Sequence, residues 1–255
     1  MCRERRDFAE TAFGDLFSTE RQRNMTPSIR PLGDSAAIVK WTGADDAEIC
    51  RAVRKLTAAF HHTVGPDSAD GLSCVVPAYS SITVHYCPNR TSFPEVARII
   101  ENALLQAESS PAVTATQIEI PVCFDTISAP DLDEVAEAHG LSAEEVIQRF
   151  CSAEYSVRMI GFSPGFPYLS GLPSELSTPR KRSPRLKVPQ GSVAIGGSQA
   201  GIYSQETPGG WNIIGRTPRQ LFRAELSQPC LLTAGDQVRF LPINVDQFNK
   251  WQDEQ

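Results

Sequence analysis

The chain has 255 residues, a formal net charge of −6 and 41% hydrophobic residues. This length suits one large or two small domains, and the apolar content is sufficient for a buried core. No apolar run approaches the roughly 20 residues that a membrane-spanning helix requires, so we expect no membrane contact. The sequence pI of ≈ 5.3 argues against nucleic acid as the main partner.

Residues 1–25 contain many charges but neither an apolar segment nor a cleavage site, so they do not resemble a signal peptide. We expect them to form a mobile tail. The seven cysteines are scattered and include no C-x-x-C pair, which is typical of reduced thiols rather than of disulfides or a zinc site. The sequence therefore predicts a cytoplasmic protein without a bound metal.

Residues 26–110 are predicted to form a small α+β domain with the element order ββαββα. Residues 29–41 contain two short strands around a Gly33-Asp34 turn, and residues 71–87 contain two more. Apolar residues at helical spacing predict one helix over residues 45–60 and a second that begins near Pro94. The polar segment 108–117 follows and is expected to be a linker.

Residues 117–245 are predicted to form a mainly-β domain with a short helical insertion. The insertion consists of two helices, over residues 130–140 and 141–150, and Ser142 with Glu145 fits a capping box for the second. Many short strands separated by Gly and Pro favour a closed barrel or a sandwich. The expected strands are QIEIPVCF (117–124), VAIGG (193–197), NIIGR (212–216), QLFRAEL (220–226), CLL (230–232) and QVRFLPI (237–243).

The segment 158–218 holds ten of the 17 glycines, which indicates short strands joined by shaped loops. It is also basic, which points to an anionic ligand or an acidic partner, with a solvated basic loop as the alternative. We expect the loops to be shaped by Gly161, Pro164, Gly165, Phe166, Gly196, Gly197, Pro208, Gly209 and Gly210. We call residues 158–218 the basic segment. Its cations are Arg158, Arg180, Lys181, Arg182, Arg185, Lys187 and Arg216.

Residues 161–165 match the G-x-S-x-G motif of serine hydrolases, but the match does not predict a nucleophile. In that motif the residue after the serine donates its backbone N–H to the oxyanion hole, and here this residue is Pro164, which has none. A rigid loop that presents Phe162, Phe166 and Tyr168 is the better interpretation, with ordinary core packing of these rings as the alternative.

The candidate substrate site combines arginines with neutral polar and aromatic residues. Arginine binds a carboxylate or a phosphate through two parallel hydrogen bonds, and prolines near these arginines restrict the backbone. Ordinary surface or interface roles for the arginines, and a core role for the tryptophan, remain as alternatives. The expected site residues are Arg180, Arg185, Gln199, Tyr203, Trp211 and Arg216.

Three motifs carry a family resemblance: GFSPGFPYLSGLP, TPRKRSPRLKVPQGSVAIGG and GIYSQETPGGWNIIGRTP. With them the chain resembles the family of the bacterial 5-oxoprolinase B subunit, which includes allophanate hydrolase subunit 1 and the sporulation kinase inhibitor KipI. The resemblance extends from about PLGDSAAIVKW to GDQVRFLPI. Phe150 stands where a histidine is common in the family, and Cys87 where an aspartate is common.

The resemblance implies a cyclophilin-like barrel and a role as the B subunit of an ATP-dependent 5-oxoprolinase. Such a protein works with homologues of the A and C subunits to open 5-oxo-L-proline to L-glutamate, with ATP as the co-substrate of the complex. The anionic substrate would match the basic segment. Two alternatives stay open: a regulatory protein that inhibits a sensor histidine kinase, and a component of allophanate or urea metabolism. The catalytic residues are not predicted.

Overall fold

The structure is a computed structural model, and it describes residues 25, 27–43, 45–60, 64–65, 68–109 and 115–253. All but Met25 of the expected N-terminal tail lies outside these residues. Positions 110–114 of the expected linker also lie outside them.

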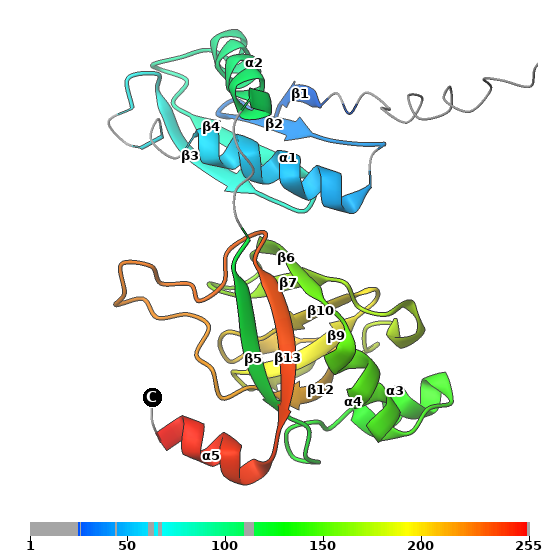
Figure 1. The fold of residues 1–255 in the computed structure, drawn as a ribbon. Helices are drawn as coiled ribbons and strands as arrows, with labels where there is room; N and C mark the ends of the chain where they lie inside the picture. The colour runs from blue at the N-terminus through cyan, green and yellow to red at the C-terminus, as the bar shows by residue number, and fades with distance from the viewer. Residues whose placement is uncertain are drawn as a thin grey trace, which may run out of the picture.

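The N-terminal part is a four-stranded antiparallel sheet on which two helices pack (Figure 1). Its strands lie in the order β1-β2-β4-β3. Helix α1 begins at the N-cap Asp45, whose side chain accepts a hydrogen bond from Glu48 N at 2.8 Å. The elements are β1 (Ser28–Pro31), β2 (Ala36–Lys40), α1 (Asp46–Ala59), β3 (Leu72–Pro77), β4 (Ser81–Tyr86) and α2 (Phe93–Ser109).

The C-terminal part is built around a closed barrel with the strand order β10-β7-β6-β13-β5-β12-β9. Strand β13 runs parallel to β5, and the other neighbouring strands are antiparallel. The barrel strands are β5 (Gln117–Cys123), β6 (Tyr155–Ile160), β7 (Pro167–Ser170), β9 (Ser192–Gly196), β10 (Gln199–Ile202), β12 (Asn212–Arg216) and β13 (Gln237–Ile243). The predicted combination of α+β structure and a barrel is therefore confirmed.

Two helices, α3 (Leu132–His139) and α4 (Ala143–Ser152), separate β5 from β6, as expected for a helical insertion. Gly140 ends α3 in the left-handed conformation. The capping box of α4 is confirmed, because Ser142 Oγ accepts from Glu145 N and the Glu145 carboxylate accepts from Ser142 N. The remaining elements are a 3₁₀ turn, η1 (Ser174–Leu176), and a two-stranded ribbon of β8 (Arg185–Val188) and β11 (Thr207–Gly209).

Successive side chains along each barrel strand point to opposite sides, so the barrel has an inner and an outer apolar face. In β9, Val193 and Ile195 belong to the main core, whereas Ala194 between them belongs to a separate small cluster. In β12, Ile214 belongs to the main core and Ile213 to the small cluster. The small cluster therefore covers the outer face, and this is where the candidate site lies.

Two expectations for the C-terminal part are wrong. Residues 220–226 and 230–232 form no strands but only one isolated bridge, between Phe222 and Cys230. These segments lie close to Pro218 and Pro229, which cannot donate to a strand ladder. The chain also ends in a helix that was not expected, α5 (Val245–Asp253). The sequence does carry a signal for the start of this helix. Asn244 and Gln247 exchange side-chain-to-backbone hydrogen bonds as in a capping box.

Ser142→Ala should lower the free energy of unfolding by about 1 kcal/mol, because the first turn of α4 loses its N-cap. Thermal unfolding followed by circular dichroism measures the loss. Ser152→Ala is the matched control at the other end of the same helix, where Oγ donates only to the backbone carbonyl of Arg149. Equal losses in both variants would contradict a specific contribution of the capping box.

Candidate functional site

An aromatic cluster covers the outer face of the barrel beside the β8–β11 ribbon. The ring centroid of Phe166 lies 5.0 Å from that of Tyr168, 5.3 Å from Tyr203 and 5.7 Å from Trp211, always edge to face. Phe162 lies 5.4 Å from Phe166 and 6.3 Å from Tyr203. We call these five residues the aromatic cluster. Phe166, Tyr203 and Trp211 are buried, whereas Phe162 is 61% exposed and forms the accessible end of the cluster.

Glycines allow these rings to lie directly on the backbone. A Cβ at Gly196 would lie 2.4 Å from the indole of Trp211, and one at Gly209 would lie 2.2 Å from the hydroxyl oxygen of Tyr203. At Gly196 the backbone is thus approached closely by a side chain of the protein itself. Gly197, the next residue, has a φ of 66° at the turn between β9 and β10.

The G-x-S-x-G segment is the turn of a β-hairpin between β6 and β7, not a turn from a strand into a helix. Ser204 Oγ donates to the carbonyl of Pro164 at 2.6 Å and lies 3.3 Å from Ser163 Oγ. Among the described contacts, no histidine meets Ser163. Phe162 takes a φ of 66°, which is unusual for a residue other than glycine and holds its ring at the surface. The geometry fits a loop that presents Phe162, whereas Phe166 is buried and Tyr168 lies half-buried in β7, and it does not fit a nucleophile elbow.

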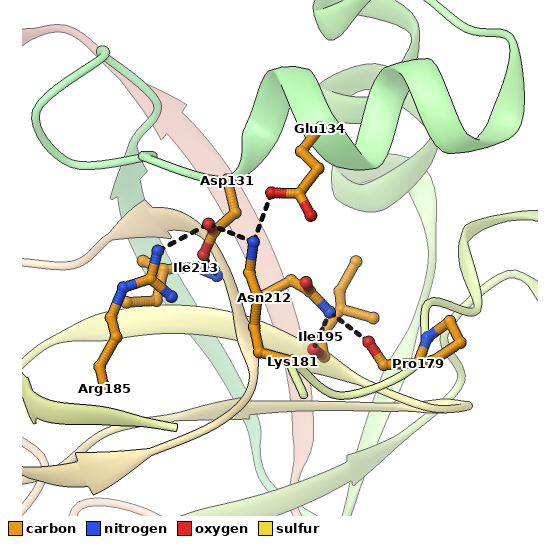
Figure 2. Close-up of polar contacts among 8 residues, drawn as sticks. All are labelled: Asp131, Glu134, Pro179, Lys181, Arg185, Ile195, Asn212 and Ile213. Atoms are coloured by element: carbon orange, nitrogen blue, oxygen red, sulfur yellow. Dashed lines mark hydrogen bonds and ion pairs between the residues drawn. The ribbon is translucent and has the colours of Figure 1, made fainter. Parts of the chain in front are cut away.

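A buried carboxylate, that of Asp131, lies next to Ile213 of the small outer-face cluster (Figure 2). Asp131 Oδ1 accepts from Arg185 Nη2 at 2.7 Å and lies 2.8 Å from Lys181 Nζ. Its Oδ2 accepts from the backbone N–H of Ile213 at 2.7 Å. Lys181 also forms an ion pair with Glu134 of α3. We call Asp131, Glu134, Lys181 and Arg185 the Asp131 centre. Neither acid was predicted from the sequence, although Asp131 stands at the N-cap position of α3.

Hydrogen bonds keep Asp131 ionised in spite of its burial. Burial by itself would raise the pKa of this carboxyl, but the hydrogen bonds from Arg185, Lys181 and Ile213 N outweigh it, so the pKa lies below its usual value. Asn212 supports the arrangement, because its Nδ2 donates to the carbonyls of Pro179 (2.9 Å) and Ile195 (3.2 Å) (Figure 2). The loop that carries Lys181 is therefore fastened to the barrel.

Arg180 is an exposed cation of this region. Its guanidinium carbon lies 5.5 Å from the centre of the Trp211 ring. Burial raises the pKa of the Tyr203 hydroxyl, while the positive charges of Arg180 and Arg185 act in the opposite direction. The structure thus brings four predicted site residues together around the aromatic cluster: Arg180, Arg185, Tyr203 and Trp211.

The other two predicted site residues differ in their placement. Gln199 is half-buried at the start of β10 and pairs with Gly196, on which Trp211 lies, so it borders the cluster. Arg216 makes its contacts elsewhere. Its Nε donates to the carbonyl of Gln190 at 2.9 Å, and its guanidinium lies 5.8 Å from the ring of Phe248 in α5.

Several charges of the basic segment are used inside the protein. Lys181 and Arg185 bind Asp131, and Lys187 pairs with Glu206 at 3.1 Å. A further cation, Arg158, is buried and lies 4.7 Å from the ring centre of Tyr79, in the loop between β3 and β4. Arg180, Arg182 and Lys187 are exposed, so the pair of Lys187 with Glu206 lies at the surface.

No helix in the described part of the chain is long and apolar enough to cross a membrane. The same residues contain no group of three or more His, Cys, Asp or Glu that could hold a metal ion. Cys50, Cys74, Cys87, Cys123, Cys151 and Cys230 are free thiols.

Asp131→Asn should lower the free energy of unfolding by about 3 kcal/mol at neutral pH, because Lys181 and Arg185 would keep their charges without a buried carboxylate. The pKa of Asp131 is lower in the folded than in the unfolded protein. The stabilisation is therefore complete above the unfolded value of about 3.9 and is lost as the pH falls through the folded pKa. Urea unfolding between pH 7 and pH 3 measures it.

The exposed Asp133 in the same helix provides the matched control, Asp133→Asn. A gap in stability between wild type and Asp131→Asn that grows on acidification would contradict the assignment. Equal losses of stability in Asp131→Asn and Asp133→Asn would also contradict the assignment.

Gly196→Ala should displace the Trp211 indole and cost about 1–3 kcal/mol of stability, because the new methyl group overlaps the ring. In protein labelled with 5-fluorotryptophan, the ¹⁹F resonance of Trp211 should shift. Gly210→Ala is the control, since its Cβ would meet no atom closer than 3.6 Å. An unshifted resonance in the Gly196 variant would show that the ring does not depend on this glycine.

Comparisons with known proteins agree with this architecture. The family described as carboxyltransferase domain, subdomain C and D, matches residues 27–232. The 5-oxoprolinase B subunit of Bacillus subtilis (strain 168) is 39% identical over 236 residues, which cover 89% of this chain and 97% of the relative.

Two solved structures share the fold but belong to longer chains. The crystal structure of TTHA0988 matches with a TM-score of 0.70 and 34% identity, over 85% of this chain and 40% of the other. The urea carboxylase of Kluyveromyces lactis matches with a TM-score of 0.68 over 88% of this chain and 22% of the other, and its identity of 18% shows the fold alone. This chain belongs to the carboxyltransferase subdomain C and D family and, within it, to the family of the 5-oxoprolinase B subunit.

Proposed function

We propose that this chain is the B subunit of an ATP-dependent 5-oxoprolinase, which opens 5-oxo-L-proline to L-glutamate together with the A and C subunits. The observation that carries the proposal is the match to the Bacillus subtilis 5-oxoprolinase B subunit, which covers nearly the whole of both chains. The chain would act as a hydrolase component in the cytoplasm, active only in the complex.

The proposal includes two domains. The first is a ββαββα domain of residues 26–110, and the second is a cyclophilin-like barrel domain of residues 117–245. The substrate site would lie on the outer face of the barrel domain, at the aromatic cluster.

The chemistry of 5-oxo-L-proline suits the aromatic cluster and its rim. The substrate is a small ring that carries one carboxylate, and Arg180 offers an exposed guanidinium for a two-point contact with such a group. The edges and faces of Phe162 and Trp211 offer an apolar wall for the ring. Gln199 and the Tyr203 hydroxyl are neutral groups that can bind the amide of the lactam.

The Asp131 centre would keep this site in shape without touching the substrate. Asp131 binds Nη2 of Arg185, so we assign this guanidinium to holding β8 in place, while its Nη1 is buried and has no hydrogen-bond partner among the described residues. This divides the predicted arginines by role. Arg180 is the binding residue and Arg185 the positioning residue.

ATP would be the co-substrate of the complex. Transfer of its terminal phosphoryl group to the amide oxygen activates a stable lactam, so that water can attack the carbonyl carbon. The C–N bond then breaks to give a ring-opened acyl phosphate, and a second water hydrolyses this acyl phosphate to L-glutamate and phosphate. Among the described contacts no histidine touches a residue of the aromatic cluster, and His139 contacts Thr178 instead, so we expect the proton transfers to be made by residues of the A or C subunits.

A role in urea or allophanate chemistry is the second candidate. It is favoured by the similarity to the urea amidolyase of Saccharomyces cerevisiae, which is 28% identical over 92% of this chain and 14% of that relative. The assay for the main proposal therefore includes urea and allophanate as competing substrates.

Reconstitution with purified homologues of the A and C subunits tests the function. We expect the three proteins together, and no pair of them, to hydrolyse ATP in a manner that depends on 5-oxo-L-proline. Size-exclusion chromatography should show this chain eluting with the C subunit. ATP hydrolysis that responds to urea or allophanate instead would contradict the proposal and support the second candidate.

In the same assay Arg180→Ala should lower kcat/KM for 5-oxo-L-proline by roughly ten- to a hundredfold, the effect of losing a charge-assisted contact. Arg180→Lys should not restore activity, because lysine keeps the charge but lacks the planar fork. Arg182→Ala is the matched control, an exposed arginine two residues away. Unchanged kinetics in both Arg180 variants, with normal complex formation, would remove Arg180 from the site.

A further inference from the structure

A second group of arginines lies at the end of β12 and in the loop that connects β12 to β13, beside helix α5. It consists of Arg216, Arg219 and Arg223, and we call it the C-terminal arginine cluster. In the described ranges of the chain, none of the three forms an ion pair with a carboxylate. This differs from the Asp131 centre, where each cation has an acid.

The spacing of two aromatic side chains in α5 explains how the cluster is held. Phe248 and Trp251 are three residues apart and therefore share one face of the helix. The guanidinium of Arg216 lies 5.8 Å from the Phe248 ring centre, and that of Arg219 lies 5.7 Å from the Trp251 ring centre. The aromatic rings stabilise the cations but do not neutralise them.

Backbone contacts fix the first two arginines further. Arg216 Nε donates to the carbonyl of Gln190 at 2.9 Å, and Arg219 N donates to Thr217 Oγ1 at 3.2 Å. Gly191 has a φ of 84° and its carbonyl accepts from Thr217 N at 2.9 Å. A Cβ at Gly191 would lie 2.3 Å from the Thr217 carbonyl oxygen, so the strand ends are closely packed here.

Two adjoining pockets open beside these side chains. The first has a volume of ≈ 260 Å³ and is lined by Arg216 and Arg219 together with polar groups that include Gln190 and Gln252. The second has a volume of ≈ 420 Å³ and is lined by Arg219, Arg223 and Trp251 among others. Both pockets share Arg219 and Gln220, and no described acidic residue lines either one.

We infer that the two pockets together bind a polyphosphate anion across the three arginines. Several guanidiniums held close together without a counter-charge repel one another, and a multiply charged anion relieves this repulsion. Phosphate oxygens match the bidentate geometry of arginine, and the glutamines add neutral donors and acceptors. The wider pocket, with Trp251 on its wall, has room for a planar ring attached to the phosphates.

The inference deepens the proposed function and rests on it only for the identity of the anion. If the chain belongs to an ATP-dependent enzyme, the anion is the triphosphate of ATP. The site is separate from the aromatic cluster, so the aromatic cluster would receive 5-oxo-L-proline and the C-terminal arginine cluster the nucleotide. Free inorganic polyphosphate has the same chemistry without the nucleoside.

Isothermal titration calorimetry on the full chain alone tests this inference without any catalysis. The probes are ATP, inorganic tripolyphosphate and adenosine. We expect ATP to bind and adenosine not to bind, with weaker binding of ATP at higher salt. Arg219→Ala and Arg223→Ala should each weaken ATP binding by roughly ten- to a hundredfold, while Arg182→Ala binds as wild type.

Arg216→Lys is the variant chosen to remain folded, because lysine keeps a charge over Phe248. It lacks the planar fork of arginine, so it tests the two-point contact with phosphate. We expect this variant to keep the melting temperature and to bind ATP more weakly. Binding of tripolyphosphate without ATP would support the anion site and assign it to free polyphosphate. Failure of wild type to bind either phosphate, or unchanged binding in all three variants, overturns the inference.

The two proposals fail separately. An active reconstituted enzyme in which this chain does not bind ATP would leave the function standing and place the nucleotide on another component of the complex. Binding of ATP by a chain that supports no 5-oxoproline-dependent hydrolysis would leave the C-terminal arginine cluster standing as an anion site.

Discussion

The outer face of the barrel depends on one buried carboxylate. Asp131 is only 3% exposed in its side chain, yet it is ionised, and it touches segments that are far apart in the sequence. It joins the start of α3 to Lys181, to Arg185 in β8 and to the backbone of β12. A buried charge is tolerated only when its partners are all in place, so these contacts form together or not at all. The β8–β11 ribbon, which contributes Val188 to the outer cluster, is positioned by this requirement.

Local signals explain which parts of the fold could be predicted. The helix predicted over residues 45–60 corresponds to α1, and the Ser142–Glu145 capping box was visible because it involves residues three apart. The parallel pairing of β5 with β13 could not be predicted, since it joins segments separated by more than 100 residues. The strand expected at residues 220–226 did not form because the barrel is already closed by other strands, and alternating apolar residues alone do not make a strand.

The candidate site was predictable in its shape but not in its charges. Glycine density located the place where Trp211 and Tyr203 lie on the backbone, because close packing of a ring requires the absence of a Cβ. The basic segment looked unbalanced because only Glu175 and Glu206 lie within it. Its main acids, Asp131 and Glu134, come from a helix about 50 residues upstream. A local count of charges cannot find counter-ions that the fold supplies.

The arginines of this protein therefore differ in what surrounds them, and that difference matters more than their position in the sequence. A guanidinium that meets a buried carboxylate uses its charge to hold the fold, as Arg185 does. A guanidinium that lies on an aromatic ring is held in place while its field still extends outward, because a ring carries no net charge. Arg180 on Trp211, Arg216 on Phe248 and Arg219 on Trp251 are of this second kind. On an acidic protein, such side chains are where an anion gains most on binding.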